Sequence, residues 1–418
     1  MTDTTDCTTR SGDGSVVRPL FFHSHTDRSL GADAWVHTQI MRHLDRATHE
    51  VHLVYVPAVS AHATPLDRAV ADITDLRRVT ISPGPKRPAA RSVRAMATTG
   101  VELVHWAVDL ARVARYVRRQ RIDLLHTADR PRDAVATVVL GKLCRRPSVL
   151  HVHVAYGEWM SRGLKWAIMA ADHRIAVSEF VRRGLVAAGA DPATTHTVLN
   201  GIEPDRWVPD GDRRDATRAT LGLADDPVVI TVCRLFESKG PAALIEAVAT
   251  SVDRVPGVQL LVVGRDTTTD QAFLDSLERR VDALGVRDRV RFLGERSDVP
   301  DLMAASDVFA MPSTEEPFGL VFTEAMAAGL PIVALGDGGT VEVVRDGVDG
   351  LLAAHGDIEQ LADHLCALLA DEPRRRELGT NGAARVRERF TVRRQADEVA
   401  AVYREITMGS DRTGRERK

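Results

Sequence analysis

Cysteine is scarce in this 418-residue chain, and its four cysteines lie far apart without a single CxxC pair. This spacing excludes the usual zinc motifs and disulfide frameworks, and it favours a reducing cytoplasm. Nowhere do eighteen apolar residues follow one another, so no segment is predicted to span a membrane. Residues 1–15 are polar and lack the apolar stretch of a signal peptide, so we expect a disordered tail there.

A large net charge is also missing. The sequence has 55 lysines and arginines against 58 acidic residues, which gives a formal net charge of -3. Nucleic-acid binding is therefore not expected. Hydrophobic residues make up 44% of the chain and charged residues 27%, a balance that is typical of a globular enzyme. The length is too great for one ordinary core and predicts two domains.

Short apolar runs alternate with helical patterns in two successive series. The first series lies between residues 19 and 202, and the second restarts after residue 225 with VVITVCR and VQLLVVG. Alternation of strand and helix predicts a parallel α/β sheet in each half. Residues 203–218 are polar and predict an exposed connection between the halves. Within it, the triplet Asp210, Gly211 and Asp212 is similar to a metal-binding DxD motif but is predicted to lie in a loop.

The segment EEPFGLVFTEAMAAG at 315–329 places two glutamates around a predicted helix start. Glu316 and the backbone amides of Gly319 and Leu320 would lie at the helix N-terminus, where the amides and the helix dipole favour a phosphate. Glu324, within the helix, can accept hydrogen bonds from a diol. Paired glutamates also occur at helix starts as capping groups or solvated charges, so the motif alone leaves both interpretations open.

The segment VCRLFESKG places Arg234 directly after a predicted buried strand and Lys239 five residues later. Ligands in open α/β sheets bind at the carboxyl ends of the strands, where both cations would lie. Two cations there can stabilise a departing diphosphate by charge and hydrogen bonds. The alternative is ordinary surface pairing with carboxylates such as Glu237.

Together, Arg234, Lys239, Glu316, the PFG of 317–319 and Glu324 resemble the donor-site signature of the retaining family-4 glycosyltransferases of the GT-B fold. Further family-like segments follow in the family's order: PSVLHVH, HRIAVSEFVRRGLVAAG and VLNGIEPDRW. The resemblance covers about residues 18–405. It implies an α/β protein with two facing Rossmann-like domains and a deep interdomain cleft.

The resemblance also implies a division of the chain. Residues 16–203 would form the acceptor domain, to which a C-terminal helix at about 390–407 crosses back. Residues 204–389 would form the nucleotide-sugar donor domain, and 408–418 a second tail.

The roles of individual residues follow from the same resemblance. Arg234 and Lys239 would bind the diphosphate, Glu316 the donor sugar and Glu324 the ribose, with Phe318, Gly319 and Leu320 completing the donor site. His153 would face the sugar from the acceptor domain, although a locally satisfied strand-end histidine is the alternative.

One loop departs from the family's pattern. Family members often have paired glycines there, which let the backbone approach the donor phosphates. Here only Gly31 is present to contact the donor, and the Ala32 that follows disfavours a positive φ. The histidines add no metal site. His151 and His153 share a strand face, but no third ligand is spaced to complete a site. His23 and His25 are predicted to be loop polar groups or acceptor contacts. No metal and no cofactor are expected.

The predicted function is retaining transfer of a sugar from a nucleotide diphosphate sugar, UDP- or GDP-linked, to a hydroxyl acceptor. The acceptor would be a small molecule, a lipid-linked group or a glycan in bacterial natural-product, glycolipid or polysaccharide biosynthesis. The main alternative is an inactive nucleotide-sugar-binding or scaffold protein on the same fold. A phosphorylase or epimerase stays open, whereas a nicotinamide-dependent oxidoreductase is set aside because no GxGxxG follows a strand.

Residues 83–121 are rich in arginine. Arg112, Arg115 and Arg119 fall on one helical face beside Val108 and Ala111. This region predicts either peripheral contact with an anionic membrane, at the inner face of a bacterial membrane, or simply a solvated helix face.

Overall fold

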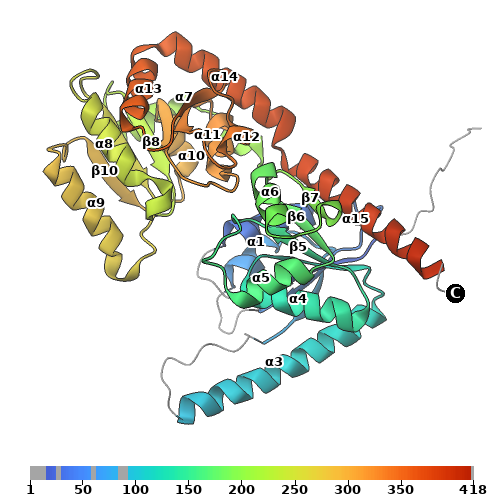
Figure 1. The fold of residues 1–418 in the computed structure, drawn as a ribbon. Coiled ribbons are helices and arrows are strands. Elements are labelled where there is room, and N and C mark those ends of the chain that lie inside the picture. Colours follow the sequence, from blue (N-terminus) through green and yellow to red (C-terminus); the bar gives the residue numbers. More distant parts are fainter. Residues whose placement is uncertain (1–15, 25–29, 58–62, 83–92, 416–418) are drawn as a thin grey trace, which may run out of the picture. The chain divides into compact units, whose positions relative to one another are not determined.

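The computed structural model describes residues 16–24, 30–57, 63–82 and 93–415, which form two parallel β-sheets with surrounding helices (Figure 1). The strands are β1 (Pro19–His23), β2 (His52–Tyr55), β3 (Arg77–Thr80), β4 (Leu124–Ala128), β5 (Ser148–Val152), β6 (His173–Ala176), β7 (Thr195–Thr197), β8 (Val228–Val232), β9 (Gln259–Val263), β10 (Val290–Gly294), β11 (Val308–Met311), β12 (Ile332–Leu335) and β13 (Gly350–Ala353). The α-helices are α1 (Ala32–His43), α2 (Pro65–Ala69), α3 (Val93–Arg119), α4 (Pro131–Cys144), α5 (Arg162–Ala170), α6 (Glu179–Ala187), α7 (Gly211–Leu221), α8 (Pro241–Ser251), α9 (Ala272–Ala283), α10 (Val299–Ala304), α11 (Leu320–Ala327), α12 (Thr340–Val343), α13 (Ile358–Ala370), α14 (Glu372–Arg389) and α15 (Val392–Arg415), and the short 3-10 helices are η1 (Pro192–Thr194), η2 (Pro204–Trp207), η3 (Glu237–Lys239) and η4 (Thr269–Gln271).

The two sheets share one strand order. The first runs β3-β2-β1-β4-β5-β6-β7, and the second runs β10-β9-β8-β11-β12-β13. Counted within its own half, the second follows the order 3-2-1-4-5-6 of a Rossmann sheet, and the first follows the same order with β7 added at its edge. The predicted α/β fold with two Rossmann-like sheets is confirmed, whereas the way the two domains face each other stays a prediction.

The chain divides into two compact units. The first comprises the described parts of Met1–Leu150, Gly163–His173 and Val399–Lys418; the second comprises His151–Arg162 and Arg174–Glu398. Helix α15 therefore contributes its first residues to the second unit and the rest to the first. The division predicted at residues 203 and 204 stays a prediction.

Each unit has its own apolar core. In the first, side chains of β1, β2 and β4 pack against α3 and α4, with Leu20, Val54, Val113 and Leu140 among the buried residues. In the second, the residues of β8 and β9 pack against α8 and α13. These strands read as nearly continuous apolar runs because parallel strands are covered on both faces.

Helix α6 begins directly after Ser178. The Oγ of Ser178 accepts a hydrogen bond from the amide of Val181 at 3.1 Å and caps the helix. Such a cap satisfies one of the amides that the first turn of a helix leaves without a partner.

The polar connection contains a helix. Gly211 and Asp212, predicted to lie in a loop, form the start of α7, because the Asp210 carboxylate accepts hydrogen bonds from the amides of Asp212 and Arg213. The loop prediction is wrong for these residues, since their polarity reflects an exposed, capped helix.

Helix α15 extends to Arg415, further than the helix end expected near residue 407. Within the first unit, the fully buried hydroxyl of Tyr403 is hydrogen-bonded to Nδ1 of His126 on β4. Near its start, the amide of Val392 donates to the carbonyl of Ile202 at 3.0 Å, and the amide of Ile202 donates to the carbonyl of Phe390 at 2.8 Å. None of the helices in the described part of the chain is long and apolar enough to cross a membrane.

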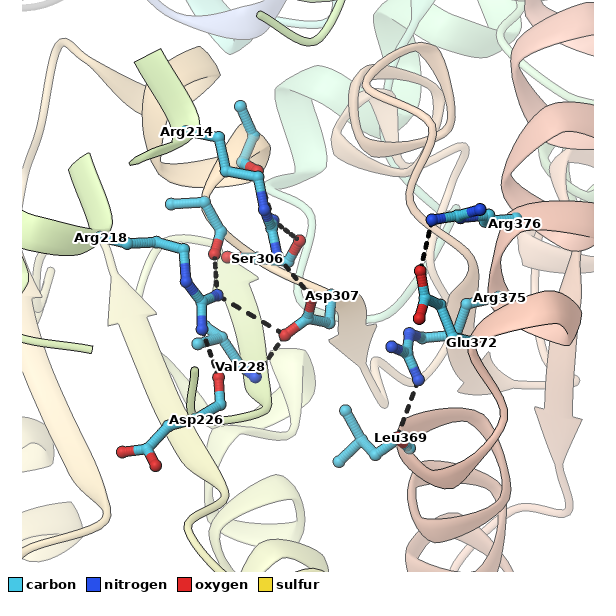
Figure 2. A network of polar contacts seen from close by, with 12 residues as sticks. Arg214, Arg218, Asp226, Val228, Ser306, Asp307, Leu369, Glu372, Arg375 and Arg376 are labelled. Atoms are coloured by element: carbon cyan, nitrogen blue, oxygen red, sulfur yellow. Dashed lines mark hydrogen bonds and ion pairs between the residues drawn. The ribbon is translucent and has the colours of Figure 1, made fainter. Parts of the chain in front are cut away.

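A cavity of about 920 Å³ opens at the amino ends of β8, β11 and β12, the edge of the second sheet opposite to the expected donor site. In Figure 2, the guanidinium groups of Arg214 and Arg218 both point at Asp307, and Arg375 and Arg376 lie across the cavity. Arg214 Nη2 is 2.8 Å from Asp307 Oδ1, and the other Asp307 oxygen accepts from the amide of Val228. Because the guanidinium groups of Arg214 and Arg218 are hydrogen-bonded to protein acceptors, we assign these residues a structural role.

Arg218 makes the densest set of contacts in this network. It donates to the backbone carbonyls of Ala224, Asp226 and Ala305 at 3.0, 2.6 and 2.8 Å, and it is 8% exposed. It thereby satisfies carbonyls where α7 and α10 end and where β8 and β11 begin.

Candidate active site

The predicted donor residues come from two neighbouring strands of the second sheet. Strand β8 pairs with β11 in parallel, so their carboxyl ends meet at the same sheet edge. Arg234 and Lys239 follow β8, and the loop that carries Glu316 follows β11. The structure therefore brings the two sequence motifs together, although 77 residues separate Lys239 from Glu316.

Lys239 and Glu316 form an ion pair. The Lys239 Nζ lies 2.5 Å from Glu316 Oε2, and the two side chains are only 18% and 7% exposed. A hydrogen bond of 2.9 Å from the amide of Thr314 to the carbonyl of Ser238 joins the two loops. The next residue, Gly240, has φ of 70°, and a Cβ there would lie 2.2 Å from the Pro312 carbonyl oxygen. The turn after Lys239 therefore requires glycine.

Arg234 is exposed and unpaired. In the described part of the chain no carboxylate forms an ion pair with it; instead its guanidinium lies over the ring of Phe236, 5.3 Å from the centroid. Lys239 Nζ lies 5.8 Å from the centroid of the same ring. Cations are attracted to the face of an aromatic ring at such distances. Phe236, which the sequence analysis missed, thus packs against both predicted diphosphate cations.

The loop after β12 supports the Glu316 loop. The amide of Gly339 donates to the Glu316 carbonyl at 2.6 Å, and the amide of Glu315 donates to Asp337 Oδ2 at 3.0 Å. A Cβ on Gly338 would lie 2.7 Å from both the nitrogen and the oxygen of Glu316, and Gly338 has φ of 60°. This loop was not predicted as part of the site, although the GDGGT segment that follows a predicted strand is a turn signal.

Helix α11 begins as the motif predicts. Gly319, in the left-handed conformation with φ of 82°, is its N-cap, and Leu320 is its first residue. Phe318 is 2% exposed, and its ring packs edge-on against Phe390 with centroids 5.8 Å apart. The Phe318 side chain anchors the loop in the core, so a donor contact by this residue would come from its backbone.

Glu324 lies in the second turn of α11 and is half-buried. Burial raises the pKa of Glu324 to about 7, and the nearby positive charge of Arg206 on η2 opposes that rise. A carboxyl group with this pKa is half-protonated at neutral pH.

Replacing Glu324 with glutamine should stabilise the ligand-free protein only above about pH 5. The folded pKa of Glu324 is raised above the ordinary value of 4.5, so wild-type stability falls as the pH rises from about 4.5 to 7 and then levels off. Glutamine does not ionise. The free energy of unfolding of the variant minus that of wild type, measured by urea unfolding, should therefore be small at pH 4.5, increase up to about pH 7 and stay constant above it, with a plateau of about 1–3 kcal/mol. The exposed Glu359→Gln is the control, and an equal difference at every pH would contradict the assignment.

The two remaining predicted site residues come from other parts of the chain. His153 follows β5 and is half-buried, with its ring centroid 4.3 Å from that of His151. Gly31 is the N-cap of α1 in the first unit, with φ of -68°, and the neighbouring Asp33 forms a bidentate ion pair with Arg130. The loop uses no positive φ at Gly31, and Ala32 starts the helix. Donor contacts by His153 and Gly31 stay predictions.

His23 is not a loop residue. It is the last residue of β1, is fully buried, and its Nε2 lies 2.9 Å from Nδ1 of His37. The loop prediction for His23 is wrong because β1 continues through it, and His25 lies outside the described residues. The absence of a required metal stays a prediction.

The two Rossmann-like sheets are those of the GT-B class. Two family models match successive parts of the chain: Glycosyltransferase Family 4 matches residues 34–206, and Glycosyl transferases group 1 matches residues 213–385. The chain belongs to the family-4 glycosyltransferases of the GT-B fold, which confirms the family resemblance.

Individual relatives agree with this assignment. The D-inositol 3-phosphate glycosyltransferase of Mycobacterium tuberculosis is 38% identical over 249 residues, which are 58% of this chain and 50% of that protein. The chain thus spans about half the length of the curated relatives it matches. Anabaena Alr3699/HepE in complex with UDP aligns at 25% identity with a TM-score of 0.77, over 93% of this chain and 100% of that one. Sucrose-phosphate synthase from Thermosynechococcus elongatus aligns at 25% identity with a TM-score of 0.71, over 94% and 100%.

Proposed function

We propose that the protein is a glycosyltransferase that moves a sugar from a nucleotide diphosphate sugar to a hydroxyl acceptor. The observation that carries the proposal is the contact between Lys239 and Glu316 beside the unpaired Arg234, at the carboxyl edge of a Rossmann-like sheet. This edge is where such sheets bind nucleotides. Two cations, a carboxylate and free helix amides are the groups that a diphosphate-linked sugar requires.

A uridine nucleotide is our choice of donor. The structures of HepE were determined with UDP and with UDP-glucose, and that protein aligns with almost the whole of this chain. A GDP-sugar remains the second candidate. Glu324, on the second turn of α11, would accept hydrogen bonds from the ribose hydroxyls.

The proposed chemistry is transfer with retention. The bond between the anomeric carbon and the diphosphate oxygen breaks while the acceptor oxygen bonds to the same face, and the acceptor proton passes to the leaving diphosphate. Negative charge grows on the diphosphate as the bond breaks, so fixed cations stabilise the transition state more than the ground state. Arg234 and Lys239 would supply that charge without a metal, and Glu316 and His153 would orient the sugar. NMR analysis of the product anomer tests retention, and activity in the presence of a chelator tests metal independence.

The acceptor is a hydroxyl compound of bacterial natural-product, glycolipid or polysaccharide biosynthesis. One curated relative is named for D-inositol 3-phosphate, which makes a phosphorylated polyol the first small-molecule acceptor to assay. Lipid-linked and glycan acceptors form the rest of the panel.

Donor binding tests the proposal directly. We expect calorimetry with UDP, GDP, ADP and TDP and their sugars, in the presence of a chelator, to show selective binding of one nucleotide. Glu324→Ala should weaken that binding about 10- to 100-fold, because it removes two hydrogen bonds of about 1 kcal/mol each. Glu359→Ala, an exposed position on α13, is the control. If none of these ligands binds, the proposal fails; binding without turnover on any acceptor would favour the inactive nucleotide-sugar-binding protein.

A further inference from the structure

Helices α3 and α4 of the first unit present an unusual group of cations. Six residues form what we call the basic face, at the C-terminal ends of the two helices and directly after them: Arg115, Arg119, Arg121, Lys142, Arg145 and Arg146. Five are exposed and Arg146 is half-buried. No carboxylate among the described residues pairs with any of them. Neither residues 110–122 nor residues 134–147 contain an acidic residue, so the chain's near-neutral total charge hides a local excess of positive charge.

The packing of the two helices brings these cations together. Nη2 of Arg118 donates to the carbonyl of Leu143 at 2.9 Å, and Sγ of Cys144 donates to the carbonyl of Ala114 at 3.7 Å. Val117 of α3 and Leu140 of α4 share one apolar core. The last turns of both helices therefore lie side by side, as Figure 1 shows for the long helix α3 and its neighbour α4.

Helix stabilisation does not account for the whole group. A cation near a helix C-terminus interacts favourably with the helix dipole. Arg118 already meets the Leu143 carbonyl at the end of α4. The other cations have no acceptor of this kind in the described structure, so their charge is available to an external anion.

Exposed aliphatic side chains continue the same surface. Val104 and Val108 of α3 are 62% and 54% exposed, and Leu143 of α4 is 62% exposed. Val104, Val108, Arg115 and Arg119 are separated by four, seven and four residues, which places them on one face of the helix. One stripe of α3 thus runs from aliphatic to cationic residues.

We propose that this surface binds an anionic phospholipid bilayer. Membrane-surface helices combine aliphatic residues, which enter the interfacial region, with lysine or arginine, which meets the lipid phosphates. Single-stranded nucleic acid is held mainly by a cationic groove with stacked aromatic rings, whereas the exposed apolar groups here are valine and leucine. A bilayer can contact both the aliphatic and the cationic residues on this face of α3. The proposal goes beyond sugar transfer and does not depend on it.

The test is co-sedimentation of the full chain with vesicles. We expect binding to phosphatidylcholine vesicles that contain phosphatidylglycerol to exceed binding to pure phosphatidylcholine vesicles about tenfold and to fall at high salt. Arg115→Glu/Arg119→Glu should remove about 90% of that binding, and Val104→Asn/Val108→Asn should also reduce it. Arg183→Glu/Arg279→Glu, which changes the net charge equally at exposed unpaired positions of α6 and α9, should leave binding within about twofold of wild type.

Three results would overturn the proposal. The first is equal binding to anionic and neutral vesicles, and the second is an equal loss in the charge-matched control. The third is binding of a short RNA or DNA instead of vesicles, which would assign the surface to nucleic acid. Melting temperatures of all variants check folding, and Lys142→Glu/Arg145→Glu at the end of α4 provides a second pair if the α3 variant unfolds.

Discussion

Replacing Lys239 with methionine should lower the rate of sugar transfer about 100- to 1000-fold, the effect of removing one preorganised charge from a developing oxyanion. The loss has two sources. The leaving diphosphate would lose a cation, and Glu316, whose side chain is 7% exposed, would lose its ion-pair partner. Without this contact the Glu316 side chain would no longer be held in place by Lys239, so it would also orient the sugar less well.

Steady-state kinetics with the donor identified by calorimetry provide the measurement. Glu237→Gln is the matched control, because Glu237 lies on the same η3 turn but is exposed; its activity should stay within about twofold of wild type. The double variant Lys239→Met/Glu316→Gln should lose little more than Lys239→Met, since the two residues act as a unit. Near-normal transfer by Lys239→Met would remove Lys239 from the mechanism.

Replacing Arg218 with methionine should lower the free energy of unfolding by about 3 kcal/mol. Three backbone carbonyls would lose their donor, and methionine fills much of the volume without replacing the hydrogen bonds. Urea unfolding followed by tryptophan fluorescence measures the change.

The control for Arg218 is its neighbour on α7. Arg213 forms ion pairs with Asp210 and Asp301 but is 53% exposed, so Arg213→Met should cost less than about 1 kcal/mol. Because the Arg218 network lies at the edge of the sheet opposite to Lys239, donor affinity in the folded variant should be unchanged. Equal costs for the two variants would show that burial of Arg218 contributes nothing.

The sequence was sufficient for the sheets because parallel strands leave a strong local signal. Buried runs such as VVITV and QLLVV correspond to β8 and β9. The position of the last strand of the first sheet is less easily predicted. The apolar segment at 197–202 is typical of a strand, but β7 covers Thr195–Thr197. Residues 200–202 instead meet the start of α15, a contact between distant segments that local periodicity does not show.

The clustering of the Lys239 and Glu316 motifs was predictable because each motif follows a strand. Parallel topology alone brings Lys239 and Glu316 to the same edge. Phe236 and Gly338 were missed for a different reason. The Phe236 ring packs against Arg234 and Lys239, and Gly338 lies against the backbone of Glu316. Neither a phenylalanine nor a glycine indicates such a contact by its residue type alone.

Under the proposed function, the half-buried carboxyl group of Glu324 would make donor binding a proton-coupled event. With a pKa of about 7, the free protein holds about half a proton at this position at neutral pH. Ribose hydroxyls that donate to Glu324 favour the carboxylate, so under the proposed function that fraction of a proton would leave for the buffer when the donor binds. The observed heat of binding at pH 7 would then depend on the ionisation enthalpy of the buffer. At pH 9, where the group is already ionised, the heats in different buffers would converge.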